Sequence, residues 1–378
     1  MNNIIAEILD SVTKIKREDW DLIFGDIPEG YNFYKTLEES GLKDFTFYYA
    51  VLYRDKEIIS IAPLFITDFN LDIAAEGWIE NMIQVIRKSV NSRFLIFKTL
   101  FCGSPFRESG ILGIRKDINE KRPILDKLIK TISEFCKEKK TTLIVFKDFL
   151  KDDCLLLDSL ISKDFLKVKS FPSVVTELNF HSFDEYLHSL GYSTRKSLRK
   201  KIKKAYESAD IRVKIAGNID DIADEIFRLY ENTYHRGATK FERLTKELFI
   251  NAGRNLSPNI KIFLYYVNGK LGAFNLCLVY KDLFIDKFIG FDYDISRKYN
   301  LYFVSWCYNI EWCLKNSIRF YQTGQTDYHP KLNLGGMLIP LYVYIRHKKS
   351  LLNLILKLLA VFLKPENFDK DIRGSTDV

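Results

Sequence analysis

A short segment near the C-terminal end of the chain holds side chains that can move a proton or bind an anion. Asp327, His329 and Lys331 place a carboxylate, an imidazole and an ammonium group within five residues, after the run Tyr-Gln-Thr-Gly-Gln-Thr. A carboxylate or imidazole can act as a general base, and an ammonium group can stabilise an oxyanion. Glycine and proline interrupt the segment, which predicts a loop leaving a strand. A surface turn with incidental charges is the alternative interpretation.

A second pair of charged residues lies inside an apolar run. Asp286 and Lys287 interrupt the run Leu-Phe-Ile-Asp-Lys-Phe-Ile-Gly, which predicts a strand over residues 283–290. Neighbouring residues of a strand point to opposite faces, so one of the two side chains must face the buried or cleft side. Burial raises the pKa of a carboxyl group, which suits it to act as a base. An internal ion pair or an edge strand would explain the same residues.

The positive charge of the chain is concentrated in one segment. The formal charge is +8, and residues 195–204 hold seven Lys or Arg and no acid, which leaves +1 for the rest of the chain (8 − 7). The segment opens a helix predicted over residues 194–207, and positive charge at the start of a helix opposes the helix dipole. The phosphates of a carrier, a nucleotide-linked acceptor or an anionic membrane are therefore candidate partners, and a solvated face is the alternative. Without interleaved aromatic residues, the segment does not indicate a DNA partner.

The elements that must position these residues occur in the same order twice. Hairpin, strand, helix and strand are predicted first at residues 45–66, 94–101, 122–139 and 142–146, with a further strand at residues 108–114, and again at residues 260–279, 283–290, 301–314 and 318–323. Asn268-Gly269 marks the turn of the second hairpin. Two more helices, at residues 194–207 and 219–235, precede that hairpin. The repeat predicts a duplicated α/β (α+β) fold.

The overall composition is that of an ordinary globular protein. The chain has 378 residues, a length that suggests two domains. Of these residues 47% are hydrophobic and 28% charged, which is typical of a globular protein. The N-terminal segment lacks the apolar run of a signal peptide, so we expect a cytoplasmic protein. Six scattered cysteines form no Cys-x-x-Cys pair, which argues against a disulfide framework and a zinc site and favours buried thiols.

Four segments taken in order resemble the FemAB-like branch of the GNAT acyltransferase superfamily, across residues 170–349. They are SFDEYLHSLGYSTRKSLRKKIKKA, LYENTYHRGATKFERLTKELF, VNGKLGAFNLCLV and YQTGQTDYHPKLNLGGMLIPLYVYIRHK. The resemblance implies two tandem GNAT-like domains, each a mixed, mostly antiparallel sheet flanked by helices. We expect these domains at residues 1–170 and 171–349, with a helix and flexible tail at residues 350–378.

The resemblance also implies an activity. It predicts an N-acyltransferase that moves an acyl group from acyl-CoA, or another activated carrier, to an amine by direct attack in a ternary complex. Acyl-CoA would be a co-substrate, with no metal and no tightly bound cofactor. Aminoacyl transfer from tRNA to a cell-wall precursor is one alternative, although the coiled-coil arm of several tRNA-dependent members has no counterpart, since no heptad array appears. A non-enzymatic, membrane-associated binding protein on a degenerate GNAT scaffold is the other.

The resemblance and the chemistry together select the site residues. We predict the catalytic residues to be Asp286, Asp327 and His329. We predict the substrate-binding residues to be Arg199, Gln322, Gln325 and Lys331. In GNAT folds the donor's phosphates lie at the start of the helix after the predicted strand, so we predict the donor-binding residues to be Arg297, Lys298, Asn300 and Tyr302. The glycine-rich pattern typical of the family is missing from this stretch.

An apolar segment follows the basic run Arg-His-Lys-Lys near the C-terminal end. Residues 351–363 read LLNLILKLLAVFL, and as a helix they span about 20 Å, too short for a bilayer core of about 30 Å. The polar residues Ser350, Asn353, Lys357 and Lys364 align on one side. Such a helix either docks on its own protein or lies in a membrane interface. The second outcome would place the protein peripherally on the inner face of a membrane.

Overall fold

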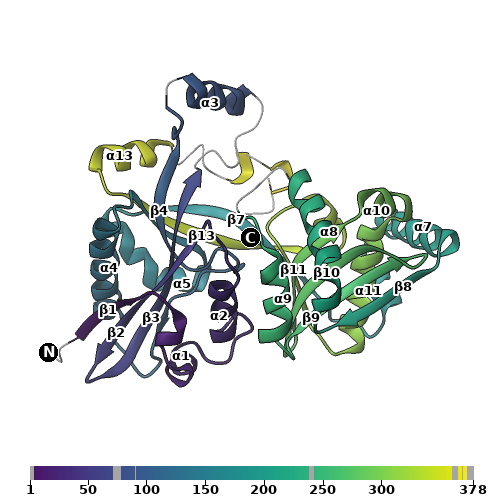
Figure 1. Cartoon of the computed structure of the whole chain (residues 1–378), viewed down its shortest axis with the longest axis horizontal. Coiled ribbons are helices and arrows are strands. Elements are labelled where there is room, and N and C mark those ends of the chain that lie inside the picture. The colour runs from purple at the N-terminus through teal and green to yellow at the C-terminus, as the bar shows by residue number, and fades with distance from the viewer. Residues whose placement is uncertain are drawn as a thin grey trace.

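One continuous sheet runs through the molecule, with helices on both of its faces (Figure 1). The computed structural model describes residues 4–70, 78–89, 91–237, 242–359, 365–367 and 369–372. In them the strand order is β1-β2-β3-β4-β6-β13-β7-β12-β11-β10-β9-β8, and β5 pairs with β3 beside this path. Most neighbours are antiparallel, whereas β4 with β6 and β11 with β12 are parallel. The predicted mixed, mostly antiparallel fold is confirmed.

The N-terminal half contains the strands from β1 to β6. These are β1 (Ile4–Leu9), β2 (Thr46–Arg54), β3 (Glu57–Asn70), β4 (Ile96–Cys102), β5 (Gly113–Ile114) and β6 (Leu143–Leu150). Its helices are α1 (Arg17–Phe24), α2 (Tyr31–Glu39), α3 (Trp78–Ser89), α4 (Lys121–Glu138) and α5 (Lys151–Leu157).

The C-terminal half repeats the arrangement with the strands from β8 to β12. These are β8 (Ile211–Ala216), β9 (Ile260–Val267), β10 (Lys270–Tyr280), β11 (Leu283–Phe291) and β12 (Phe320–Thr323). Its helices are α6 (Phe183–Ser189), α7 (Tyr192–Ser208), α8 (Ala223–Arg236), α9 (Lys246–Asn255), α10 (Tyr293–Tyr299), α11 (Leu301–Lys315) and α12 (Tyr328–Asn333). A last helix, α13 (Ser350–Leu359), follows.

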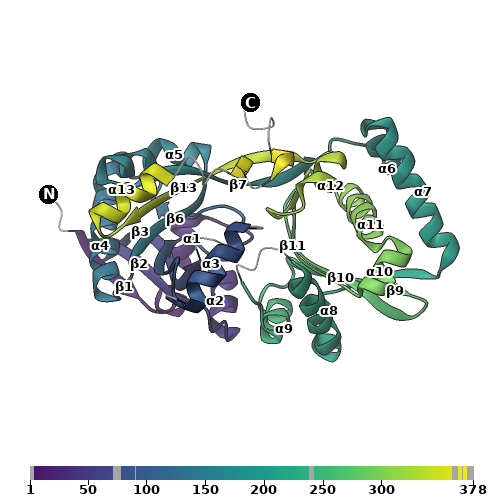
Figure 2. The ribbon, with the colours of Figure 1, turned by 90° about the horizontal axis from the view of Figure 1, so that it is seen from above.

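Two long strands cross between the halves. β7 (Leu166–Glu177) leaves the N-terminal half and pairs with β12, while β13 (Met337–His347) returns from the C-terminal half and pairs with β6. The two crossing strands also pair with each other, and both are visible at the centre of Figure 2. Each half therefore completes its sheet with a strand from across the molecule. The expected boundary at residue 170 falls inside β7, and the division at that point stays a prediction.

Local sequence patterns predict most of these elements well. Both hairpins form, and the Asn268-Gly269 turn has the left-handed backbone that its sequence favours, with φ of 50° and 81°. The strand predicted over residues 108–114 is wrong, since only Gly113–Ile114 is a strand. Gly110 instead donates its main-chain N–H to Asp148, and its missing Cβ allows close approach to Lys147 and Phe149. The segment therefore packs across the end of β6.

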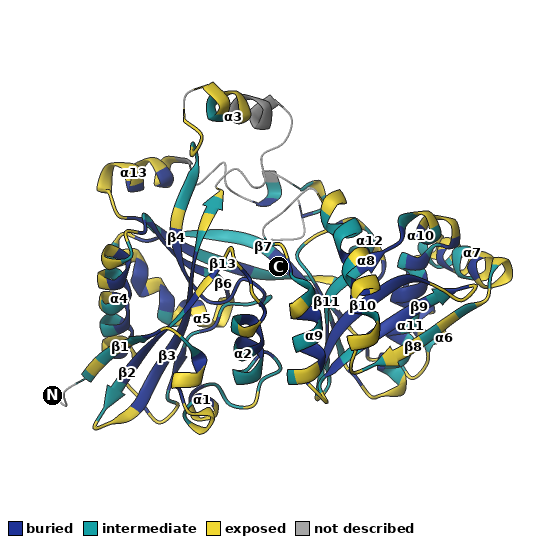
Figure 3. Ribbon diagram, in the orientation of Figure 1, coloured by how far each residue is buried: buried dark blue, intermediate teal, exposed yellow. Residues whose placement is uncertain are grey.

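Clusters of buried apolar residues form the core of both halves. Figure 3 shows the buried residues concentrated in the strands, with exposed residues on the outer helices and turns. All six cysteines are buried free thiols, as the sequence predicts. Among the described residues, no group of His, Cys, Asp or Glu converges in a way that could hold a metal ion. None of the helices in the described ranges is long and apolar enough to cross a membrane.

Candidate active site

Two parallel strands of the C-terminal half separate part-way along their length. β11 and β12 pair only over residues 283–286 and 320–323, so that Asp286 and Thr323 are the last register partners. Beyond them β11 continues to Phe291, whereas the chain leaves β12 toward α12. The separation creates a fork in the C-terminal half of the sheet, with Asp286 at its base.

A chain of buried hydrogen bonds holds the Asp286 carboxylate. Asn275 Nδ2 and the Tyr321 hydroxyl donate to its two oxygens, over 2.5 Å and 2.9 Å. Asn309 Nδ2 donates to Asn275 Oδ1 over 2.9 Å, and the Tyr265 hydroxyl donates to Asn309 Oδ1 over 2.6 Å. The side chains of β9, β10, β11, β12 and α11 thus fix one carboxylate in one orientation.

The environment of Asp286 prepares it to accept a proton. Loss of hydration raises the pKa of Asp286 to about 6, while the hydrogen bond from Tyr321 and the charge of Lys331 oppose the rise. A carboxylate with this pKa is ionised at neutral pH and is more basic than an exposed one. Asp286 therefore has both the fixed geometry and the basicity of a general base.

Lys331 belongs to the same electrostatic group. It lies in α12, it is buried, and its Nζ donates to the main-chain oxygen of Gly324 over 2.7 Å. Burial lowers the pKa of Lys331, and the negative charges of Asp286, Glu108 and Asp327 oppose this effect. Three carboxylates thus act on its ammonium group, and the predicted binding of a substrate anion by Lys331 stays a prediction.

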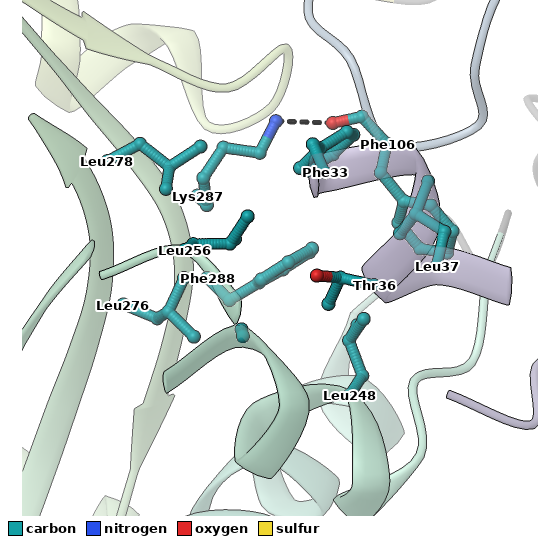
Figure 4. Close-up of a pocket in the computed structure, with 11 residues that line it drawn as sticks. Phe33, Thr36, Leu37, Phe106, Leu248, Leu256, Leu276, Leu278, Lys287 and Phe288 are labelled. Carbon is teal, nitrogen blue, oxygen red and sulfur yellow. Dashed lines mark hydrogen bonds between the residues drawn. The ribbon is translucent and has the colours of Figure 1, made fainter. Parts of the chain in front are cut away.

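Lys287 points to the other face of β11, as strand alternation requires. Its side chain is 2% exposed and its Nζ lies 2.7 Å from Glu29 Oε1 and 3.8 Å from Glu108 Oε1. Lys287 also donates to the main-chain oxygen of Phe106 (Figure 4). An internal ion pair, the alternative interpretation for this residue, is what forms. Its partners come from the N-terminal half, where isolated acidic residues form no sequence motif.

The polar cluster continues into the N-terminal half. Lys147 donates to Asp148, and Asp148 also accepts from the Ser170 hydroxyl. Burial raises the pKa of Glu242 to about 7, against the opposing charges of Lys147 and Lys287. None of these residues was predicted as functional. The charges of Lys147 and Lys287 thus act on the same buried carboxyl group, although the two lysines belong to different halves.

A small apolar cavity lies beside Lys287, between α2, α9 and the strands β10 and β11 (Figure 4). It encloses about 20 Å³, which is room for about one water molecule. Its walls include Phe33, Phe106 and Phe288. A larger open hollow of about 360 Å³ lies beside α10. Residues 322–331 line neither of these two spaces.

The structure separates His329 from Asp286. The His329 side chain is 73% exposed, its Nδ1 lies 3.2 Å from Asp371 Oδ1, and its Nε2 lies 3.1 Å from Asn333 Nδ2. Asp327 is also exposed and begins α12 with a left-handed backbone. The segment predicted as a loop thus contains a helix, which turns His329 outward and Lys331 inward. The catalytic assignments of His329 and Asp327 stay predictions.

The other predicted substrate-binding residues have partners in the fold. Gln322 Nε2 donates to the Ser173 hydroxyl over 3.1 Å, and Gln325 Nε2 donates to the main-chain oxygen of Phe171 over 3.0 Å. The first bond joins β12 itself to β7, and the second attaches the segment after β12 to β7. Arg199 lies on the surface of α7 and pairs with Asp184 over 2.7 Å. These three side chains are therefore engaged in the fold.

The predicted donor-binding segment contains a short helix of its own, α10. Asp292 caps α10 by accepting from the N–H of Ile295, which gives this stretch a stable helical start. Arg297 and Lys298 are exposed on α10, and Lys298 lines the open hollow. Asn300, with a φ of 54°, joins α10 to α11.

Tyr302 is the predicted donor-binding residue on which the charge of Asp286 acts. Its hydroxyl is buried and has no hydrogen-bond partner among the described residues. Burial and the charges of Asp327 and Asp286 raise the pKa of Tyr302. An unpaired buried hydroxyl beside two carboxylates is a free donor at the start of α11.

Comparisons with known proteins agree on the architecture. The FemAB-like family model, described as peptidoglycan biosynthesis and recognition, matches residues 11–338. No curated protein matches the chain. FemX has a TM-score of 0.57 and 11% identity, over 93% of this chain and 100% of its own. L-PGS from Bacillus licheniformis has a TM-score of 0.53 and 11% identity, over 89% of this chain and 97% of its own.

A third solved structure carries the GNAT name. It is a tandem GNAT protein from the clavulanic acid biosynthesis pathway, solved without AcCoA, with a TM-score of 0.53 and 10% identity over 91% of this chain and 98% of its own. Identities this low show a shared fold. The tandem arrangement predicted from the sequence is therefore confirmed.

Proposed function

Because this chain belongs to the FemAB-like family and is a GNAT-type transferase, we propose that it moves an acyl group from acyl-CoA, or a similar activated carrier, to an amine. One observation carries the proposal. Asp286 lies where β11 and β12 stop pairing, and it is held there by a buried network that leaves it basic. A fork with a base at its centre suits an acyl carbonyl and an attacking amine.

The proposed reaction needs one base and one stabilised oxyanion. The amine nitrogen attacks the thioester carbonyl, a C–N bond forms, and the nitrogen gives its proton to Asp286. The intermediate then collapses, the C–S bond breaks, and the thiolate takes up a proton and leaves as a free thiol. The attack is direct, so no covalent enzyme intermediate forms. Asp286 fits the base because its pKa of about 6 lies close to neutral pH.

Lys331 and Tyr302 are proposed to bind the developing negative charge. Lys331 is buried beside three carboxylates, and the Tyr302 hydroxyl has no partner in the described part of the chain. Preorganised donors in a dry site stabilise an oxyanion without reorganising solvent. Arg297, Lys298 and Asn300 at the junction of α10 and α11 are proposed to hold the donor's phosphates.

A second candidate function is aminoacyl transfer from tRNA to a cell-wall precursor. Lys196, Lys200 and Lys204 are exposed at intervals of four residues and therefore share one stripe of α7. Within the described residues they form no ion pair, and α7 lies on the outer side of the C-terminal half (Figure 2). A stripe of exposed ammonium groups without carboxylate partners suits a phosphate backbone. Replacing all three by Glu should abolish a salt-sensitive gel shift with tRNA if this function is correct.

The test of the main proposal is thiol release from a panel of short- and long-chain acyl-CoAs in the presence of amines. We expect release that depends on the amine. Lys331→Met should lower the rate about 10²-fold or more, the typical loss for one oxyanion donor. Lys315→Met is the matched control, because that lysine is 70% exposed and pairs only with Glu311.

The thermal stability of both lysine variants separates loss of chemistry from loss of folding. No amine-dependent thiol release with any donor would refute acyl-CoA transfer. Binding of acyl-CoA without turnover would favour the non-enzymatic alternative.

A further inference from the structure

The last described helix is docked on the protein by its polar side. Asn353 is 5% exposed, accepts from the main-chain N–H of His347 over 2.8 Å and donates to the main-chain oxygen of Asp164 over 2.8 Å. Lys357 Nζ lies 3.5 Å from the Asp164 carboxylate. Surface helices of globular proteins usually pack their apolar stripe inward. In α13 a single described apolar side chain, Leu356 (8% exposed), packs inward beside Asn353, and the other described apolar side chains face outward.

The outward face of α13 is apolar. Its exposed residues are Leu351 (71%), Leu352 (37%), Leu354 (54%), Ile355 (42%) and Leu358 (68%). Four of them recur at helical spacing and so form one continuous stripe. Five of the fifteen large hydrophobic residues exposed in the described chain lie on this one helix. Such a concentration marks an interaction surface rather than scattered exposure.

The charge around the stripe is positive. Lys348 and Lys349 precede the helix, are exposed and form no ion pair within the described residues. No acidic residue occurs between residues 341 and 365. Helix α3 projects from the same side of the molecule and carries the exposed residues Val85 and Lys88 (Figures 1 and 3). A leucine stripe with a rim of lysines is complementary to an anionic surface with an apolar interior.

We propose that α13 docks this protein on an anionic lipid bilayer. The leucines enter the boundary between head groups and acyl chains, while Lys348 and Lys349 contact the lipid phosphates. With ten residues the helix is about 15 Å long, so it lies in the interface and does not cross the bilayer. A second copy of the chain is a poorer occupant, because the lysine rims of both copies would meet. The inference does not rest on the acyl-transfer proposal.

The experiment is cosedimentation of the full chain with vesicles of phosphatidylcholine containing about a third phosphatidylglycerol, and with vesicles of pure phosphatidylcholine. We expect binding to the anionic vesicles. The triple variant Leu351→Gln, Leu354→Gln, Leu358→Gln should bind them at least about tenfold more weakly, because inserted apolar area drives interfacial binding. Leu155→Gln on α5, where the leucine is 89% exposed, is the control and should bind like the unmodified chain.

Two further measurements distinguish lipid binding from misfolding and from self-association. The variant Lys348→Gln, Lys349→Gln should lose most of the preference for anionic vesicles. The leucine triple variant should keep its thermal stability and release thiol from soluble substrates at the rate of the unmodified chain. The membrane proposal can therefore be refuted without refuting the proposed function, and the reverse. Equal vesicle binding by the triple variant, or no binding by the unmodified chain, overturns the proposal. A dimer in sedimentation velocity that the triple variant abolishes also overturns it, in favour of a second copy.

Discussion

Replacing Asp286 by asparagine should lower activity and raise stability at neutral pH. The substitution keeps the size of the side chain and removes its charge. The pKa of Asp286 rises from the ordinary 3.8 to about 6 in the folded state because of burial. Since each pH unit is worth about 1.4 kcal/mol, ionised Asp286 costs the folded state about 3 kcal/mol above pH 6.

The sign of this effect is opposite to that of an ordinary aspartate. Between about pH 4 and pH 6 the folded protein holds a proton that the unfolded chain has released, so Asp286 lowers stability as pH rises through this window. The asparagine amide in Asp286→Asn has one acceptor oxygen, whereas Asn275 and Tyr321 both donate a hydrogen bond to this side chain. One of the two bonds is therefore lost, which costs about 1 kcal/mol. Asp286→Asn should therefore stabilise the protein by about 2 kcal/mol at pH 7.5 and destabilise it by about 1 kcal/mol near pH 4.

Urea unfolding at both pH values and the pH profile of thiol release test this prediction together. The unmodified enzyme should gain activity as Asp286 ionises near pH 6, and Asp286→Asn should lower kcat about 10²- to 10⁴-fold, the usual contribution of a general base. Asp117→Asn changes an exposed carboxylate that pairs with Arg115 and serves as the control. A variant that keeps full activity refutes the reasoning. So does a variant whose change in stability, measured against the unmodified chain, is less favourable at pH 7.5 than at pH 4.

Three further substitutions test other parts of the structure. His329→Ala should change kcat only about twofold and stability by at most about 0.5 kcal/mol, because the imidazole is 73% exposed; a loss as large as that of Asp286→Asn would restore His329 as the base. Glu29→Gln should lower the free energy of unfolding by about 3 kcal/mol in urea titrations, since it breaks a buried pair with Lys287, and a loss below about 1 kcal/mol would show that Glu108 compensates. Gly290→Ala should cost about 1 to 3 kcal/mol or more, because a Cβ there would lie 2.7 Å from the main chain of Leu229, and an unchanged Tm would contradict this contact.

The elements that the sequence predicts well depend on neighbours along the chain. The apolar face over residues 122–139 predicts α4 within about a residue, and Asn268-Gly269 predicts its hairpin, since helix periodicity and turn chemistry are local. Asp286 was identified for the same reason, as a charge inside an apolar strand. The density of polar groups around Lys331 also identified a residue that the fold places near Asp286.

The parts that the sequence did not predict depend on contacts between distant residues. The partners of Lys287 are Glu29 and Glu108, isolated charges whose meaning depends on how the two halves meet. His329 and Lys331 are two residues apart, and only the start of α12 decides which of them turns inward. The C-terminal apolar segment is a helix as predicted up to residue 359, while residues 360–363 lie outside the described residues, and its periodicity does not reveal that Asn353 faces the protein.

The exchange of β7 and β13 sets the order in which this chain can mature during synthesis. β6 is complete once residue 150 has been synthesised, but β13, which pairs with its edge, is complete only at residue 347. During that interval the nascent chain exposes a row of unpaired main-chain groups, which invites pairing with another chain. The first half to be translated is thus among the last to be finished, whereas β12 of the second half finds its partner β7 already synthesised.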